Sequence, residues 1–278
     1  MDRERTGRAP RIGLALSSGG ARGFAHVGVI KALHQAGLNV VGVAGSSMGS
    51  IMAAGYAIRG DIEELERWVL AFRARDHARR GLPIMDAERI TDFFDTILGG
   101  ARFADCALPL AIVATDLERG EPATLTAGPL ALAAYASMAM PFLHRPVRWE
   151  GRLLAEGSLS CVLPLAQARQ VRDATVDLVI GSMVGQEWSR LDDALAGLSR
   201  TAGRITRGWR RQYADFFRAR NLHLVADIAE PAPPTIVVAP DLARVGVFDF
   251  AKAKEAIAAG ERAALAKLGE IKALLGFA

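Results

Sequence analysis

The stretch VVGVAGSSMGSIMAAGYA (residues 40–57) decides the fold class of this 278-residue chain. Its first five residues are short and apolar, which is typical of a buried strand, and the small residues from Met48 to Ile58 predict a helix. Between them stands Ser47, with Gly45 and Gly49 two positions away on either side. So tight a turn presents the serine hydroxyl at a helix amino terminus, where developing negative charge is favoured. We therefore expect a nucleophile elbow, with Ser47 as nucleophile and Ser46 and Met48 as its neighbours.

A second strand-turn-helix unit precedes this one. The apolar run IGLALS (residues 12–17) predicts a strand, and residues 23–37 have helical spacing that ends in a glycine. Two such units in succession favour a parallel, doubly wound sheet. We predict an α/β fold, a three-layer α/β/α domain with a mainly parallel central sheet.

The loop between that strand and helix is Ser18-Gly19-Gly20-Ala21-Arg22-Gly23. Small residues let backbone amides approach an oxyanion closely, so the loop is a candidate oxyanion loop. The alternative is a dinucleotide site, but the spacing is not G-x-G-x-x-G. The strand at 40–44 also ends without the carboxylate that would hold a ribose.

The remaining patterns predict a single domain over residues 11–278 after a charged, flexible tail at residues 1–10. We expect strands at 108–115 and 123–127 that form a hairpin, and a second hairpin that turns at Glu150-Gly151. Late strands are expected at 176–183 and 234–238, with a buried helix at 130–138. Amphipathic helices are expected at 61–80, 86–98 and 250–275, with Asp61 and Asp86 as N-caps.

Composition excludes several classes of protein. The net charge of +4 is modest for this length and does not suggest nucleic acid. Cys106 and Cys161 lack a paired spacing, so we expect no disulfide, no metal and no cofactor. The charged amino terminus lacks the apolar run of a secretion signal, and residues 130–143 are too short to span a bilayer. We expect a cytoplasmic protein, and the patterns predict no oligomeric state.

A serine nucleophile needs a base, and the histidines offer few candidates. His26 and His34 lie in the first predicted helix, His77 in a charged helix and His144 before a proline. Only His223 lies late in the chain, as in α/β-hydrolases, although the oxyanion motif of those enzymes is missing. Asp116 reads as a turn-stabilising acid. A carboxylate base elsewhere therefore has to be considered.

Several blocks resemble the bacterial branch of the patatin-like phospholipase family, which is related to neuropathy target esterase domains. They run in the family order over nearly the whole chain: residues 15–33, 40–57, 114–120, 135–147, 151–169 and 237–260. The resemblance implies a serine–aspartate dyad without a catalytic histidine, a glycine-rich oxyanion loop and hydrolysis of lipid acyl esters. It matches Ser47 to the nucleophile, and Gly19, Gly20 and Arg22 to the loop.

Two positions depart from the family pattern. Ser18 stands where the loop usually begins with glycine. The family's Asp-Gly-Gly or Asp-Gly-Ala block reads Glu156-Gly157-Ser158, so a glutamate one methylene longer occupies the position of the base. A displacement of about 1 Å can cost a hundredfold in rate. We expect an acyl hydrolase with a Ser47–Glu156 dyad; the alternative is a catalytically impaired member that binds lipid or a protein partner.

Residues 191–221 interleave arginines with aromatic residues. The simplest interpretation is a solvated helix with its aromatic side chains in the core. The functional alternative is a lid, or a peripheral contact with an anionic membrane beside the mouth of the site.

Overall fold

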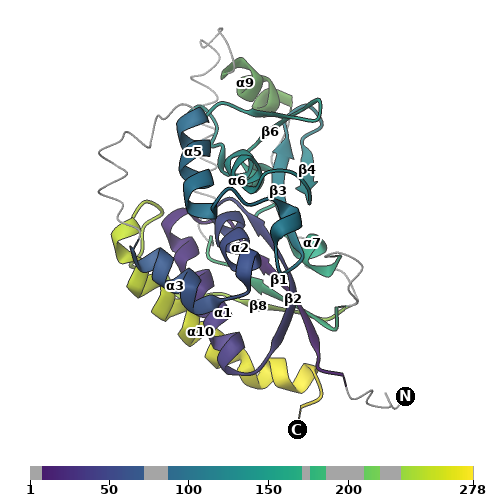
Figure 1. Ribbon diagram of the computed structural model, residues 1–278, viewed down its shortest axis with the longest axis vertical. Helices are drawn as coiled ribbons and strands as arrows, with labels where there is room; N and C mark the ends of the chain where they lie inside the picture. Colours follow the sequence, from purple (N-terminus) through teal and green to yellow (C-terminus); the bar gives the residue numbers. More distant parts are fainter. Residues whose placement is uncertain (1–7, 72–86, 171–175, 186–209, 220–232, 278) are drawn as a thin grey trace.

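The computed structural model describes residues 8–71, 87–170, 176–185, 210–219 and 233–277. The strands in these ranges form one eight-stranded sheet in the order β5-β6-β3-β2-β1-β7-β8, with β4 also paired to β3 (Figure 1). The parallel strands are β1 (Arg11–Leu16), β2 (Asn39–Ser46), β3 (Leu110–Asp116), β7 (Leu178–Ser182) and β8 (Thr235–Val238). The antiparallel strands are β4 (Glu121–Leu125), β5 (Val147–Trp149) and β6 (Arg152–Ala155).

Helices cover both faces of this sheet. Successive side chains of a strand point to opposite faces, and in β1 Leu14 and Leu16 enter the larger core while Ala15 enters a smaller one. The helices of the larger core are α1 (Ala25–Gln35), α2 (Met48–Arg59), α3 (Ile62–Ala71), α5 (Ala87–Leu98), α6 (Leu130–Met138) and α10 (Ala253–Leu274). The smaller core lies between α7 (Leu165–Arg169) and the opposite face of the sheet; in Figure 1, α7 lies to the right of β1 and β2.

The predicted α/β/α architecture with a mainly parallel sheet is confirmed, and most predicted elements lie within a few residues of their expected bounds. A short 3₁₀ helix, η1 (Gly20–Phe24), precedes α1, so the first α-helix begins two residues later than predicted. Asp61 accepts a hydrogen bond from the Glu64 amide at 2.9 Å, as an N-cap does. The helix predicted at 61–80 is described as far as Ala71, and Asp86 lies outside the described residues.

A third cluster of buried side chains lies at the β6 end of the sheet. It is made by the helix α9 (Arg210–Ala219), which packs on β6 and on the turn η4 (Gly157–Leu159). Figure 1 shows α9 above β6, far from α10. Part of the predicted basic segment is therefore a helix beside Glu156, while its residues 191–209, 220 and 221 lie outside the described residues.

Candidate active site

Ser47 lies between the end of β2 and the first residue of α2. Its backbone has φ 53° and ψ −124°, a left-handed conformation that is uncommon for residues other than glycine. The glycines on either side are required by close contacts. A side chain at Gly45 would collide with the Gly49 backbone, and one at Gly49 with the carbonyls of Leu16 and Ser17. The chain thus turns sharply here and leaves Ser47 with 9% of its surface exposed.

Hydrogen bonds hold this strained turn on both sides. The Ser47 amide donates to the Ser137 hydroxyl at 2.8 Å, and that hydroxyl donates to the Val113 carbonyl at 2.6 Å. The Ser47 carbonyl accepts from the amide and the hydroxyl of Ser50. Conformational strain persists only where the surroundings fix it, and such strain is often found at functional sites.

Ser137 is a residue whose role the sequence patterns did not reveal. It stands in α6, a mostly apolar and largely buried helix, and links that helix to β3 and to the turn at Ser47. The sequence did contain a sign of this role, because a serine hydroxyl in an apolar, buried helix needs a hydrogen-bond partner. The pattern could not name that partner.

The pairing of β6 explains how Glu156 reaches Ser47. Along β3, β4 takes one edge from Ile112 to Asp116, so β2 and β6 share the other edge. β2 pairs with β3 as far as Val113, and β6 pairs antiparallel with Thr115 and Asp116 just beyond. The two strands therefore run toward each other along one edge of β3. Glu156 follows β6 and Ser47 follows β2, so the two residues meet where these strands end.

The Glu156 side chain is 2% exposed. Burial raises its pKa from 4.5 to about 7, while hydrogen bonding by Ser47 and Ser158 acts in the opposite direction. Its Oε1 lies 3.4 Å from the Ser158 amide. Among the described residues, Oε2 has no hydrogen-bond partner of ordinary geometry. Ser47 is nevertheless close enough to Glu156 to lower the pKa of its carboxyl. A carboxyl with a pKa near neutrality can act as a general base at neutral pH.

The backbone of Glu156 is fixed from two other elements. Its carbonyl accepts from the Thr115 hydroxyl of β3 at 2.8 Å. Its amide donates to the Ala139 carbonyl, just past the end of α6, at 3.1 Å. Next to it, a side chain at Gly157 would collide with the Val113 carbonyl and the Ser46 hydroxyl. The predicted block Glu156-Gly157-Ser158 therefore packs directly on the ends of β2 and β3.

The loop at residues 18–23 lies beside the same strand ends. The amides of Ser18, Ala21 and Arg22 donate to the carbonyls of Val162, Val247 and Gly19. In the part of the chain that the structure describes, the Gly19 and Gly20 amides donate to no backbone carbonyl outside the regular elements. The Arg22 side chain donates to the Val245 carbonyl at 2.7 Å and so ties the loop to the segment before α10. Gly19 and Gly20 are thus the members of the predicted loop best suited to face an oxyanion.

The described histidines have structural contacts away from Ser47. The His26 ring is fully buried between the Ser17 carbonyl and the Ser182 hydroxyl, each at 2.8 Å, and burial lowers its pKa to about 4. His34 contacts the Tyr56 hydroxyl, and His144 accepts from the Met140 amide. His77 and His223 lie outside the described residues.

Asp116 has the arrangement of a turn-stabilising acid. Its Oδ1 accepts from the amides of Glu118 and Arg119 at 3.0 and 3.1 Å. This is the geometry expected where a carboxylate closes the turn of the β3–β4 hairpin.

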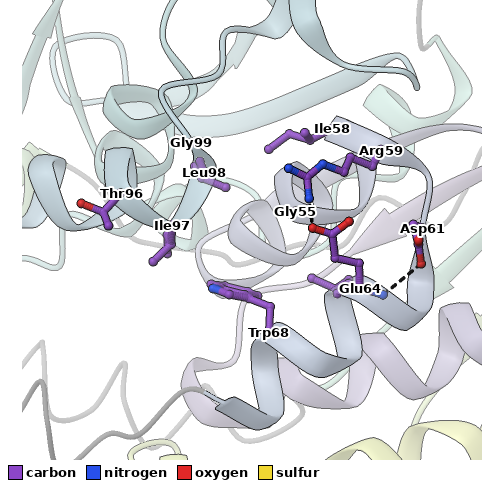
Figure 2. Close-up of a pocket in the computed structure, with 11 residues that line it drawn as sticks. Gly55, Ile58, Arg59, Asp61, Glu64, Trp68, Thr96, Ile97, Leu98 and Gly99 are labelled. Carbon is purple, nitrogen blue, oxygen red and sulfur yellow. Dashed lines mark hydrogen bonds and ion pairs between the residues drawn. The ribbon is translucent and has the colours of Figure 1, made fainter.

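A pocket of about 250 Å³ lies at the opposite end of α2 from Ser47. Its lining comes from the end of α2, from α3 and from α5, and Figure 2 shows the Arg59 guanidinium facing the Glu64 carboxylate, with which it forms an ion pair. Trp68 and Ile97 line the apolar side. Because α2 separates this pocket from the residues described above, it is not part of the candidate active site.

Neither a metal site nor a membrane span is found in the described ranges. No group of three or more His, Cys, Asp or Glu side chains there could hold a metal ion. No helix there has both the length and the apolar character needed to cross a bilayer.

Comparison with known proteins identifies the family. The model of the patatin-like phospholipase family matches residues 14–169, more than half of the chain. This chain belongs to the patatin-like phospholipase family. The match includes the turn at Ser47, the loop at 18–23 and the block at 156–158.

Individual relatives agree with this assignment. An uncharacterized NTE family protein of Mycobacterium tuberculosis is 38% identical over 199 residues, which are 69% of this chain and 54% of that protein. The lysophospholipase nte1 of Aspergillus fumigatus is 30% identical over 166 residues, 56% of this chain and 11% of its own. The chain thus spans about half the length of the mycobacterial relative and a small part of the fungal one.

A solved structure shares the fold. Human GIVD cytosolic phospholipase A2, in complex with methyl gamma-linolenyl fluorophosphonate, aligns over 99% of this chain and 60% of its own with a TM-score of 0.51. At 13% identity this likeness concerns the fold alone.

Proposed function

We propose that this protein is a serine acyl hydrolase, of the phospholipase, lysophospholipase or carboxylesterase type, that uses a Ser47–Glu156 dyad. The observation that carries the proposal is the meeting of a strained serine with a buried carboxyl at the facing ends of β2 and β6. The pKa of about 7 supports it further, because a large fraction of Glu156 is then ionised at neutral pH and still basic.

The first half of the reaction forms an acyl-enzyme. The Glu156 carboxylate takes the proton of the Ser47 hydroxyl while Ser47 Oγ attacks the ester carbonyl carbon. The resulting oxyanion accepts hydrogen bonds from the Gly19 and Gly20 amides, and the amino terminus of α2 favours its charge. Collapse breaks the ester bond, and the alcohol leaves with the proton held by Glu156.

The second half releases the acid. Glu156 takes a proton from a water molecule, whose oxygen attacks the acyl carbon attached to Ser47. A second oxyanion forms in the same place, the bond to Ser47 Oγ breaks, and the proton returns to Ser47. The fatty acid leaves and the free dyad is restored.

Three variants test this proposal on a lysophospholipid and a short-chain nitrophenyl ester. Ser47→Ala should reduce hydrolysis to background and abolish labelling by a fluorophosphonate probe. Glu156→Gln should lower kcat about 10²–10⁴-fold, the usual contribution of a general base. Glu150→Gln is the matched control, because its exposed carboxylate lies in the turn of the same hairpin; it should hydrolyse like wild type.

Two results would contradict the proposal. Folded wild type that hydrolyses no faster than Ser47→Ala on both esters would favour the impaired, lipid- or partner-binding alternative. Loss of activity in His223→Asn, with Glu156→Gln unaffected, would favour a histidine-dependent hydrolase instead.

We also propose that the segment 191–221 makes peripheral contact with anionic membranes, and that the protein works in the cytoplasm. In α9, Tyr213 and Phe216 are buried against the site, whereas Arg211 is exposed on the outer side and forms an ion pair with the exposed Asp215. Sedimentation with anionic and neutral liposomes tests the contact. Binding should favour the anionic liposomes and weaken in Arg210→Gln/Arg211→Gln; equal binding to both, unchanged in the variant, would remove the electrostatic role.

A further inference from the structure

Tyr213 connects α9 to the backbone of the proposed catalytic acid. Its side chain is fully buried, and its hydroxyl donates to the Ala139 carbonyl at 3.0 Å. The same carbonyl accepts the Glu156 amide at 3.1 Å. A carbonyl oxygen has two lone pairs, so one oxygen links the phenol of Tyr213 to the backbone of Glu156.

The position of Ala139 means that this link also holds the loop that follows α6. Ala139 lies just past the end of α6 with ψ 79°, so its carbonyl is outside the hydrogen-bond ladder of that helix. The residues after it form a loop in which Phe142 has a left-handed φ of 64° and packs on the Tyr213 ring at 5.8 Å between centroids. Tyr213 therefore holds this loop by its hydroxyl and by its ring.

Tyr213 is also close to the acid itself. Burial raises the pKa of Tyr213 most, and the charges of Tyr135 and then of Glu156 raise it further. The cluster around it includes Leu153, Ala155 and Leu159, which flank Glu156 in sequence. The phenol and its neighbours thus form part of the wall that excludes water from Glu156.

We propose that Tyr213 is a positioning residue for Glu156, holding the Ala139 carbonyl and closing the wall around the acid. This inference rests on the proposed function for its kinetic consequences. In this proposal Tyr213 acts through the backbone of Glu156, by way of the Ala139 carbonyl. The packing of α9 on β6 then fixes the position of Glu156 relative to Ser47.

The decisive variant is Tyr213→Phe, which removes the hydroxyl and keeps the ring. Without that donor the Ala139 carbonyl is held less firmly, so the Glu156 backbone can shift and water can reach the carboxyl. We expect kcat to fall about tenfold with KM unchanged, since displacements of less than 1 Å suffice for such a loss. Wetter surroundings should also move the acid limb of the pH–rate profile to lower pH, by about 0.5 unit.

Tyr56→Phe is the matched control. Its buried hydroxyl contacts His34 at 2.6 Å in the second half of α2, at a distance from the dyad. It should lower thermal stability as Tyr213→Phe does, while kcat and the acid limb remain those of wild type. A Tyr213→Phe variant with wild-type kcat and wild-type acid limb would overturn the inference, because a merely structural hydroxyl would give this result.

A second measurement works even if wild type has no Ser47-dependent activity. Thermal unfolding is followed at pH 4.5 and pH 8 for wild type, Glu156→Gln, Tyr213→Phe and the double variant. If Tyr213 keeps Glu156 buried, the extra stabilisation by Glu156→Gln at pH 8 should shrink in the Tyr213→Phe background. An unchanged gain would overturn the inference independently of the proposed function.

Discussion

Glu156 experiences opposing influences that set its pKa. Burial raises the pKa, and hydrogen bonding by Ser47, followed by the amide and the hydroxyl of Ser158, lowers it. Ser158 replaces a small apolar residue of the family pattern, and in this chain its hydroxyl assists the longer acid by stabilising the ionised form. The two departures in the block Glu156-Gly157-Ser158 therefore bear on the same property, the ionisation of the acid.

Ser158→Ala should raise the pKa of Glu156 above about 7, because a hydrogen bond to the carboxylate is lost. The acid limb of kcat/KM should move to higher pH, so that activity falls about threefold at pH 6 and stays unchanged at pH 9 for a shift of roughly 0.5 unit. A pH–rate profile of the variant beside wild type measures this. A limb that stays in place or moves to lower pH would show that Ser158 does not stabilise the carboxylate.

At the level of elements, α1 and α10 approach each other through glycines. A side chain at Gly260 of α10 would collide with the Ala25 carbonyl, and one at Gly28 of α1 with the Ile257 carbonyl. Gly269 lies in the same helix α10 with no atom nearby that a side chain would meet. One helix thus contains a glycine required by packing and another that packing does not require.

Gly260→Ala should lower the free energy of unfolding by about 1–3 kcal/mol, the usual effect of overpacking. Gly269→Ala should raise it by about 0.5–1 kcal/mol, because alanine loses less conformational freedom in a helix. Urea unfolding of both variants measures the difference. Two changes of the same sign would contradict the close packing of α1 on α10.

For the whole molecule, buried titratable groups make stability depend on pH in two directions. Burial lowers the pKa of His26 and of His144 from 6.5 to about 4. Their contribution is therefore present above pH 6.5 and lost as the pH falls toward 4. Glu156 acts in the opposite sense: its raised pKa favours the folded state most below pH 4.5, and this contribution is lost as the pH rises through 7.

Glu156→Gln should therefore stabilise the protein increasingly as the pH rises from 4.5 to 7, by up to roughly 3 kcal/mol. Wild type itself should lose stability below pH 6.5, because two histidines outweigh one glutamate. Thermal unfolding of both proteins between pH 4 and 8 tests this, with Glu150→Gln as the exposed control. A gap between Glu156→Gln and wild type that is constant over this range would contradict the buried, raised pKa of Glu156.

Local patterns in the sequence were enough to predict the elements and their class. The strand and helix around Ser47 were expected at 40–44 and 48–58, and they occupy Asn39–Ser46 and Met48–Arg59. Hydrophobic periodicity and glycine spacing are properties of neighbouring residues, so they are visible in the chain itself. The family resemblance, drawn from several blocks in order, is confirmed by the family match.

Other features depended on contacts between residues far apart in the chain. Glu156 comes near Ser47, across more than a hundred residues, only because β6 pairs with β3 along the same edge as β2, just beyond the point where β2 ends. Only packing raises the pKa of Glu156. Only the tertiary structure brings Ser137 to the Ser47 amide, and Tyr213 to the Ala139 carbonyl that also accepts the Glu156 amide. The sequence alone thus determined the strand order along the chain, the turn at Ser47 and the family. The tertiary structure decided how the proposed acid, Glu156, comes near Ser47 and how deeply it is buried, because register and burial arise from long-range packing that no local pattern specifies.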